Sequence, residues 1–234
     1  MKILCTICAR GGSKGVKNKN IKLLNNKPLI GYTIETAKSW GKFDSIIVST
    51  DSEDIKKVAE EYGIRVPFKR PEELSGDSVG KLDVIKHAVK FLEDQGEFYD
   101  VIIDLDATSP MRYVEDIENA YQKLINNNLD IVYSVCKARK NPYFNMVEID
   151  EDGVPRLVKN LGKQVLSRQA APAVYEMNAS IYVYRKDFLL NIKTLFVDKS
   201  DIYVMPPERS VDIDDEIDFN FVEYMLKNEK LGTK

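Results

Sequence analysis

Residues 3–15 read ILCTICARGGSKG and carry the strongest structural signal in this chain of 234 residues. The first seven are apolar except for Thr6, as is typical of a parallel strand buried on both faces. A basic, glycine-rich loop follows directly. Open α/β sheets bind ligands at the carboxyl ends of their strands, and glycines there let backbone N–H groups approach phosphate closely. The stretch therefore predicts a parallel α/β sheet with a phosphate-binding loop at its edge.

Beyond this stretch, strand and helix patterns alternate as far as residue 136. Apolar runs and helical spacing predict strands at 46–50, 64–68, 101–105 and 130–136, and helices from Pro28 and at 52–62, 82–92 and 114–126. Repeated strand–helix–strand units imply parallel strands joined by right-handed crossovers. The fold class is therefore α/β with a mostly parallel sheet.

The pattern changes over residues 137–178, which are rich in Pro, Asn and charged residues and lack helical periodicity. Turn signals there predict short extended pieces. Alternation then resumes with a strand at 179–184, a helix from 186, a strand at 202–205 and a helix from 214. The last helix is expected to use Ile217, Phe221 and Tyr224 as its apolar face. We therefore expect one α/β domain, formed by 1–136 and 179–234, with an extended excursion at 137–178.

The composition excludes several classes of protein. With 44% apolar residues, 30% charged residues and a net charge of −3, the chain is typical of neither disordered proteins nor general nucleic-acid binders. No apolar run approaches the roughly 20 residues of a membrane span, and the N-terminus lacks a signal-peptide pattern. We expect a cytoplasmic protein without nucleic-acid or membrane partners.

The cysteines and the single histidine do not suggest a metal or catalytic site. Cys5 and Cys8 lie three positions apart on a predicted strand, so they point to opposite faces. A structural zinc site needs four Cys or His ligands, whereas the chain offers only Cys136 and His87 besides this pair. An odd number of cysteines suits a reducing compartment. Because His87 lies mid-helix, any general base is expected to be a carboxylate or a metal-bound hydroxide.

The charges are unevenly distributed along the chain. Residues 1–34 hold seven Lys or Arg and no acidic residue, whereas residues 201–223 hold eight acidic residues and one Arg. The two segments could meet around a polyphosphate and its metal ion. Alternatively, both are solvated surfaces, as most charge runs are.

The glycine-rich loop carries the first candidate site residues. Arg10, Ser13, Lys14 and Lys19 could hold phosphate groups together with the backbone of the loop. The loop is neither a P-loop nor a G-x-G-x-x-G dinucleotide fingerprint, because both spacings are absent. The alternative is a flexible basic loop.

Asp212 and Asp214 carry the second candidate site. In an extended segment both carboxylates point the same way, with Ile213 toward the core, and such a pair suits Mg²⁺ bound to substrate phosphates. Alternatively, they cap the last helix. Asp104 and Asp106 form a rival pair that we interpret as a capping turn, with Asp106 able to hydrogen-bond a polyhydroxylated substrate.

These motifs together resemble the acylneuraminate cytidylyltransferases, the CMP-sialic acid synthetases. The matching motifs are, in chain order, ARGGSKG at 9–15 with Lys19-Asn20, IVSTD at 47–51, RPEEL at 70–74, TSPMR at 108–112, Arg168-Gln169, NASIY at 178–182 and Asp212-Ile213-Asp214. Each motif alone is a weak signal, but their order along nearly the whole chain is a specific one.

The resemblance implies a reaction and an architecture. CTP and a nine-carbon 2-keto sugar acid would give a CMP-sugar and pyrophosphate, on a Rossmann-like sheet with helices on both faces. A homodimer is implied, in which the 137–178 excursion reaches the partner subunit.

The resemblance also implies roles for individual residues. Arg10, Ser13, Lys14 and Lys19 would hold the triphosphate, Asp212 and Asp214 would bind Mg²⁺, Asn20 and Arg70 would contact the nucleoside, and Arg168, Gln169 and Asn178 would belong to the sugar site. Arg10, Lys19 and the two aspartates would be the catalytic groups. Arg168 suits the carboxylate of a sugar acid because its guanidinium presents a planar fork of donors.

One motif departs from the pattern of the sialic acid enzymes. The chain reads Leu-Asp-Ala-Thr-Ser-Pro around Asp106, where those enzymes have Leu-Gln-Pro-Thr-Ser-Pro, and the variant is more similar to the bacterial legionaminic acid branch. The alternatives are a cytidylyltransferase for another acceptor, such as Kdo or an alditol phosphate, or an inert nucleotide-sugar-binding regulator. An inert protein would have little need of both Asp212 and Asp214.

Overall fold

The structure of the chain, a computed structural model, describes residues 1–13, 15–163 and 165–229. Its strands are β1 (Ile3–Cys8), β2 (Leu23–Leu24), β3 (Lys27–Pro28), β4 (Ser45–Ser49), β5 (Val101–Leu105), β6 (Ile131–Lys137), β7 (Val147–Ile149), β8 (Pro155–Leu157), β9 (Tyr175–Arg185) and β10 (Ser200–Val204). Its helices are α1 (Leu29–Trp40), α2 (Glu53–Glu61), α3 (Lys81–Asp94), α4 (Val114–Asn126), α5 (Lys186–Asn191) and α6 (Glu216–Glu229), with short 3-10 helices at Lys19–Ile21, Glu72–Leu74, Arg168–Ala170 and Pro207–Arg209.

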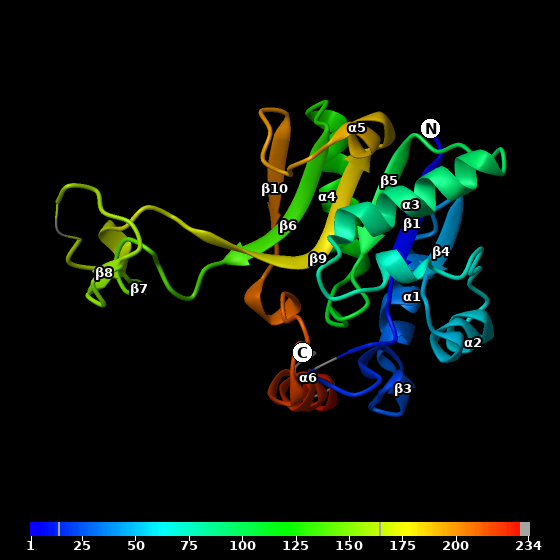
Figure 1. Ribbon diagram of the computed structural model, residues 1–234, viewed down its shortest axis with the longest axis horizontal. Coiled ribbons are helices and arrows are strands. Elements are labelled where there is room, and N and C mark those ends of the chain that lie inside the picture. The colour runs from blue at the N-terminus through cyan, green and yellow to red at the C-terminus, as the bar shows by residue number, and fades with distance from the viewer. Residues whose placement is uncertain (14, 164, 230–234) are drawn as a thin grey trace.

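A six-stranded sheet in the order β10-β6-β9-β5-β1-β4 forms the centre of the molecule (Figure 1). β1 pairs in parallel with β4 and β5, and β10 pairs in parallel with β6. β9 lies antiparallel between β5 and β6. The predicted mostly parallel sheet is confirmed, and its antiparallel strand lies inside the sheet. As a result, the carboxyl ends of β1, β5, β6 and β10 meet the amino end of β9 at one edge.

Helices cover both faces of the sheet, as predicted. Side chains of α1, α2 and α4 build the core on one face, and those of α3 and α5 build it on the other. In β1, Ile3, Cys5 and Ile7 enter the first core while Leu4 enters the second, because successive side chains of a strand alternate between faces. Each large apolar side chain buried in this way contributes about 1.5–3 kcal/mol. Cys5 is buried, and Cys5, Cys8 and Cys136 are all free thiols.

The predicted strand at 64–68 is wrong. The segment makes only isolated parallel bridges beside β4, between Arg65 and Ile47 and between Lys69 and Thr50. Pro67 lies between these bridges and has no N–H to donate, so a continuous ladder cannot form there.

The predicted apolar face of the last helix is also wrong. Ile217, Phe221 and Tyr224 are 78%, 51% and 67% exposed, whereas Phe219 and Val222 are buried. α6 packs on a small third core that includes side chains of the 16–29 segment, away from the main sheet. The helix carries apolar residues on two sides, and this packing partner selects the side that is buried.

Residues 138–174 form an arm that projects from the body between β6 and β9 (Figure 1). Both strands of the β7–β8 hairpin in the arm are exposed along their whole length. Large apolar side chains of the arm are exposed as well, among them Met146, Val147, Ile149, Val154, Leu157, Leu161 and Leu166. The arm lies within the 137–178 excursion, and the division of the chain into an α/β domain and a dimerisation excursion stays a prediction. No helix in the described part of the chain is both long and apolar enough to cross a membrane.

Candidate active site

Two adjoining cavities open at the sheet edge where the strand ends meet. The first cavity has a volume of about 330 Å³ and the second about 260 Å³, and both are lined by Cys8, Arg10 and Asp106. The first cavity is also lined by Ser13, Gly15, Lys19, Asn20, Thr108 and Asp214, and the second by Arg70, Leu74, Gly76, Asp77, Val79, Lys81 and Val84. The structure therefore brings most of the predicted site residues together.

The glycine-rich loop folds back against the acidic segment after β10. Gly11 N–H donates to Asp51 Oδ1 at 2.9 Å, which anchors the start of the loop. A Cβ at Gly15 would lie 2.0 Å from the carbonyl oxygen of Asp214, so this approach requires glycine. The loop and the aspartate pair are thus in backbone contact. Lys14, predicted as a phosphate ligand, lies outside the described residues.

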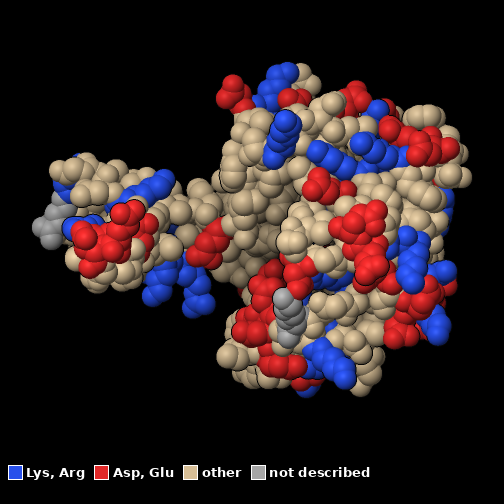
Figure 2. Space-filling view, in the orientation of Figure 1, with Lys and Arg blue, Asp and Glu red and all other residues tan. Residues whose placement is uncertain are grey.

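The basic and acidic segments meet at the first cavity, as the charge distribution suggested. The Lys19 ammonium donates to the carbonyl of Ile213 and lies 3.6 Å from Asp214 Oδ1. Arg10 pairs with Asp77 at 2.8 Å. Acidic side chains gather around α6 and its neighbouring loops in Figure 2. Two cations beside a glycine-rich backbone make this cavity suitable for phosphate groups.

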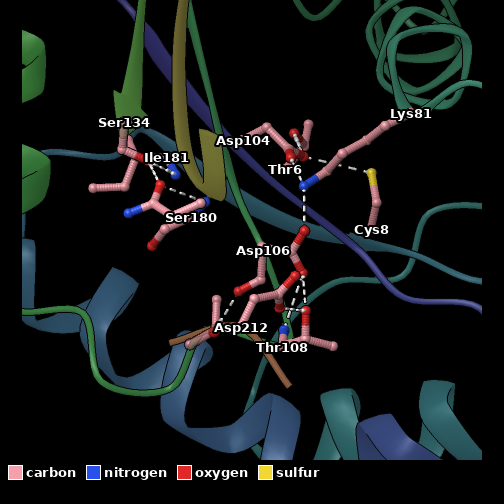
Figure 3. A network of polar contacts seen from close by, with 12 residues as sticks. Thr6, Cys8, Lys81, Asp104, Asp106, Thr108, Ser134, Ser180, Ile181 and Asp212 are labelled. Atoms are coloured by element: carbon pink, nitrogen blue, oxygen red, sulfur yellow. Dashed lines mark hydrogen bonds and ion pairs between the residues drawn. The ribbon is translucent and has the colours of Figure 1, made fainter. Parts of the chain in front are cut away.

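Three polar side chains connect the segment that follows β5 with the segment that follows the Pro207–Arg209 helix (Figure 3). The Thr108 hydroxyl lies 2.7 Å from Asp106 Oδ1 and 2.5 Å from Asp212 Oδ1. Burial would raise the pKa of Asp106, but Lys81 and the Thr108 donors outweigh it and lower that pKa to about 2. Burial and the nearby charge of Asp106 raise the pKa of Asp212 to about 6. Among the described residues, Lys81 thus offsets the burial of Asp106, whereas the burial of Asp212 is not offset in this way.

This donor set fits a hard divalent cation. Asp214 is exposed beside Lys19, Asp212 is half-buried, and Ile213 between them is buried as predicted. No group of three or more His, Cys, Asp or Glu within residues 1–13, 15–163 and 165–229 could hold a metal by itself. Mg²⁺ is usually held by one or two carboxylates together with substrate phosphates, so a pair of aspartates suffices.

The structure adds Lys81 and Asp104 to the site. The Lys81 ammonium lies 2.9 Å from Asp104 Oδ2 and 2.6 Å from Asp106 Oδ2, and the Thr6 hydroxyl donates to Asp104 Oδ1 at 2.7 Å. Asp106 does form the predicted turn, since its Oδ1 accepts from Thr108 N–H, whereas Asp104 is fully buried in β5. One signal in the sequence could have indicated Lys81: a cation at the first residue of a helix is unfavourable there and needs another reason.

The two residues predicted to contact the nucleoside lie at the cavity walls. Arg70 is 5% exposed, and its guanidinium donates to the hydroxyl and carbonyl of Ser49. Burial lowers the pKa of this guanidinium. Asn20 donates from Nδ2 to the carbonyl of Arg10 at 3.0 Å, while its buried Oδ1 has no donor among the described residues. Asn20 therefore presents beside the first cavity an acceptor that the described residues leave without a donor.

The predicted sugar-site residues are separated in space. Asn178 is buried at the amino end of β9, where its Oδ1 accepts from Ser134 at 2.6 Å and its Nδ2 donates to Ser210 at 3.0 Å. These contacts favour a positioning role for Asn178 over a direct contact with sugar. Arg168 and Gln169 are exposed on the arm and line neither cavity. One chain therefore does not bring them to the other site residues.

Comparisons with known proteins identify the family of this chain. Post-translational flagellin modification protein B of Campylobacter coli is 42% identical, covering 99% of this chain and 98% of its own length. CMP-N,N'-diacetyllegionaminic acid synthase of Campylobacter jejuni subsp. jejuni serotype O:2 matches with the same identity and coverage. The structure of CMP:2-keto-3-deoxy-manno-octonic acid synthetase complexed with CTP superposes with a TM-score of 0.71 at 16% identity, covering 98% of this chain and 100% of that chain, so the Rossmann-like fold is shared. A family model described as Cytidylyltransferase matches residues 4–229, and the chain belongs to that family of nucleotidyltransferases.

Proposed function

We propose that this protein transfers CMP from CTP to a nine-carbon 2-keto sugar acid of the legionaminic or sialic type and releases pyrophosphate. The observation that carries the proposal is the contact of the basic glycine-rich loop with Asp214 at the first cavity, to whose wall Asp212 is joined through Thr108. The 42% identity to an enzyme named for a legionaminic acid supports an acceptor of that type. The free cysteines suit a reaction in the reducing cytoplasm.

The two cavities suit the two ends of CTP. The first cavity, with Arg10, Ser13 and Lys19, would take the triphosphate, and Arg10 would exchange its partner Asp77 for phosphate oxygens. The second cavity combines the Arg70 guanidinium with apolar side chains and would take the nucleoside. Asn20 would supply its unsatisfied acceptor to a donor of the nucleotide.

Phosphoryl transfer depends on positioning and on charge neutralisation more than on covalent help from the protein. Asp212 and Asp214 would hold Mg²⁺, which supplies neutralisation of the triphosphate charge when bound. Arg10 and Lys19 would orient the α-phosphorus for in-line attack by the anomeric hydroxyl of the sugar acid and would stabilise the leaving pyrophosphate. The chain has one histidine, His87, and it lines neither cavity. The proton of that hydroxyl would therefore go to a carboxylate of Asp212 or Asp214.

We place part of the sugar site on a second subunit. Arg168 and Gln169 lie on the arm, outside both cavities of their own chain, and the arm leaves large apolar side chains exposed. In a homodimer, the arm of one subunit would bury these side chains and bring Arg168 to the neighbouring site. There the guanidinium would bind the carboxylate of the sugar acid.

The test is pyrophosphate release with CTP, Mg²⁺ and a panel of acceptors that includes legionaminic, sialic and pseudaminic acids, Kdo and alditol phosphates. We expect turnover with a nonulosonic acid, loss of turnover in EDTA and strong preference for CTP over ATP. Turnover with only Kdo or an alditol phosphate would move the protein to another acceptor class. CTP binding without turnover on any acceptor would instead indicate a regulator.

Mixed dimers test the shared site. Arg168→Ala chains and Asp212→Ala chains are each expected to be inactive, because each lacks one half of the composite site. Mixing them lets the intact nucleotide half of one chain meet Arg168 of the other, so partial activity should return. Absence of recovery in verified heterodimers would show that each chain builds its own sugar pocket.

A further inference from the structure

The Lys81 ammonium lies between two carboxylates in the wall of the second cavity. Its Nζ is 2.9 Å from Asp104 Oδ2 and 2.6 Å from Asp106 Oδ2 (Figure 3). Asp104 is fully buried in β5, and Asp106 follows the end of that strand. Two oxygens from an Asp-x-Asp pair thus converge on one positive charge.

The remaining oxygens of this pair are engaged elsewhere. Asp104 Oδ1 accepts from the Thr6 hydroxyl at 2.7 Å and lies 3.5 Å from the Cys8 thiol. Asp106 Oδ1 accepts from the backbone and hydroxyl of Thr108. Both Oδ2 atoms are therefore left for Nζ, and within the described residues Lys81 makes the ion pairs of both carboxylates.

Lys81 lies at a helix position where a positive charge is unfavourable unless a nearby negative charge compensates for it. It is the first residue of α3, where the helix dipole disfavours a cation. The two carboxylates reverse this preference, because a buried carboxylate without a counter-charge is costly. A divalent cation held by two carboxylates would provide the same compensation.

The site thus contains two Asp-x-Asp pairs joined through Thr108. Asp104 and Asp106 share the Lys81 ammonium, whereas the cation paired with the Asp212–Asp214 segment among the described residues is the more distant Lys19, 3.6 Å from Asp214. From the sequence alone the two pairs look alike, and the lysine distinguishes them.

We propose that Lys81 is a fixed cation that takes the place of a divalent metal ion at Asp104 and Asp106, so that Asp212 and Asp214 remain as the metal-binding pair. Lys81 is then a positioning residue that holds Asp106 at the wall between the two cavities. The assignment of Asp212 and Asp214 as the metal-binding pair rests on the proposed function, but it does not depend on which sugar acid is the acceptor.

The test counts bound Mn²⁺ by electron paramagnetic resonance, in wild type and in Lys81→Ala, without nucleotide. Removing the ammonium opens the pair toward the second cavity, so Lys81→Ala is expected to bind one more Mn²⁺ per chain than wild type. Lys81→Arg keeps the charge and is expected to bind as wild type does. An equal number of ions in wild type and Lys81→Ala overturns the proposal.

Lys186→Ala is the matched control. Lys186 also bridges two carboxylates, Glu93 at 3.2 Å and Asp187 at 2.7 Å, and its side chain is 24% exposed, against 30% for Lys81. It lies in α5 and lines neither cavity. We expect no additional ion in this variant, and an additional ion there would show that any lysine removal near acids produces the effect.

Thermal unfolding keeps the test decisive if Lys81→Ala folds poorly. Millimolar Mn²⁺ is expected to raise the unfolding temperature of Lys81→Ala by more than that of wild type, because the ion replaces the lost ammonium. The proposal is overturned if the second substitution Asp104→Asn restores the unfolding temperature of Lys81→Ala but Mn²⁺ does not. Lys81 would then only balance the charge of the carboxylates, without occupying the place of a metal ion. None of these measurements uses turnover, so failure of the proposed function, seen as wild type without pyrophosphate release, is distinguishable.

Discussion

Asp212→Asn is expected to stabilise the metal-free protein while abolishing turnover. Burial and the charge of Asp106 raise the pKa of Asp212 from 3.8 to about 6, so ionised Asp212 lowers the free energy of unfolding. Each unit of pKa difference between the folded and unfolded states corresponds to about 1.4 kcal/mol of unfolding free energy. The ionised carboxylate therefore destabilises the fold by about 3 kcal/mol at pH 7.5. Asparagine keeps an oxygen for Thr108 and removes the charge.

The raised pKa of Asp212 determines the pH range in which its ionised carboxylate destabilises the fold. Above about pH 6, Asp212 is ionised in both folded and unfolded chains, and the full destabilisation is present. Below 3.8 it is protonated in both states, and the difference from Asp212→Asn disappears. The stability advantage of the variant should therefore be largest at pH 7.5 and decline between pH 6 and pH 4.

The assay is thermal unfolding in EDTA across this pH range. For a chain of this length, 1 kcal/mol shifts the unfolding temperature by roughly 2–4 °C, so about 3 kcal/mol should give a rise of roughly 6–12 °C at pH 7.5. Asp214→Asn is the control: its side chain is 81% exposed, so stability should change by less than about 0.5 kcal/mol although turnover is lost. An Asp212→Asn variant that melts at or below wild type at pH 7.5 would refute the reasoning.

Three further substitutions test other parts of the site. Gly15→Ala places a Cβ 2.0 Å from the Asp214 carbonyl, so CTP titration should show at least tenfold weaker binding, whereas Gly12→Ala, with nothing within 4 Å, should bind normally. Arg70→Lys loses the guanidinium contacts with Ser49 and should raise the KM for CTP about tenfold in steady-state kinetics, with the KM for the sugar unchanged. An equal rise in both KM values would contradict a role of Arg70 in nucleoside binding. Asn178→Ala removes the hydrogen bonds with Ser134 and Ser210 and should lower the unfolding free energy by about 1–3 kcal/mol in urea titrations. A variant that is as stable as wild type but has a raised sugar KM would favour direct sugar contact instead.

Much of the site was accessible from the sequence because its residues follow buried strands. The apolar run of β1 places the glycine-rich loop at the sheet edge. The alternation around Ile213 separates a buried isoleucine from Asp214, which lines the first cavity, and from Asp212, which contacts Thr108 in its wall. These are local rules, in which a strand alternates its faces and a ligand lies at the carboxyl ends of parallel strands. They required no knowledge of which strands pair.

The tertiary structure alone decided the features that depend on partners distant in sequence. β9 runs antiparallel between β5 and β6, α6 buries Phe219 in place of Phe221, and Lys81 reaches Asp104. Periodicity shows that a helix has an apolar side but does not select between two such sides, and a single lysine carries no mark of the carboxylates it will meet. The physical reason is that pairing, packing and charge compensation are properties of contacts, and these contacts join residues 20 or more positions apart, which local sequence patterns do not record.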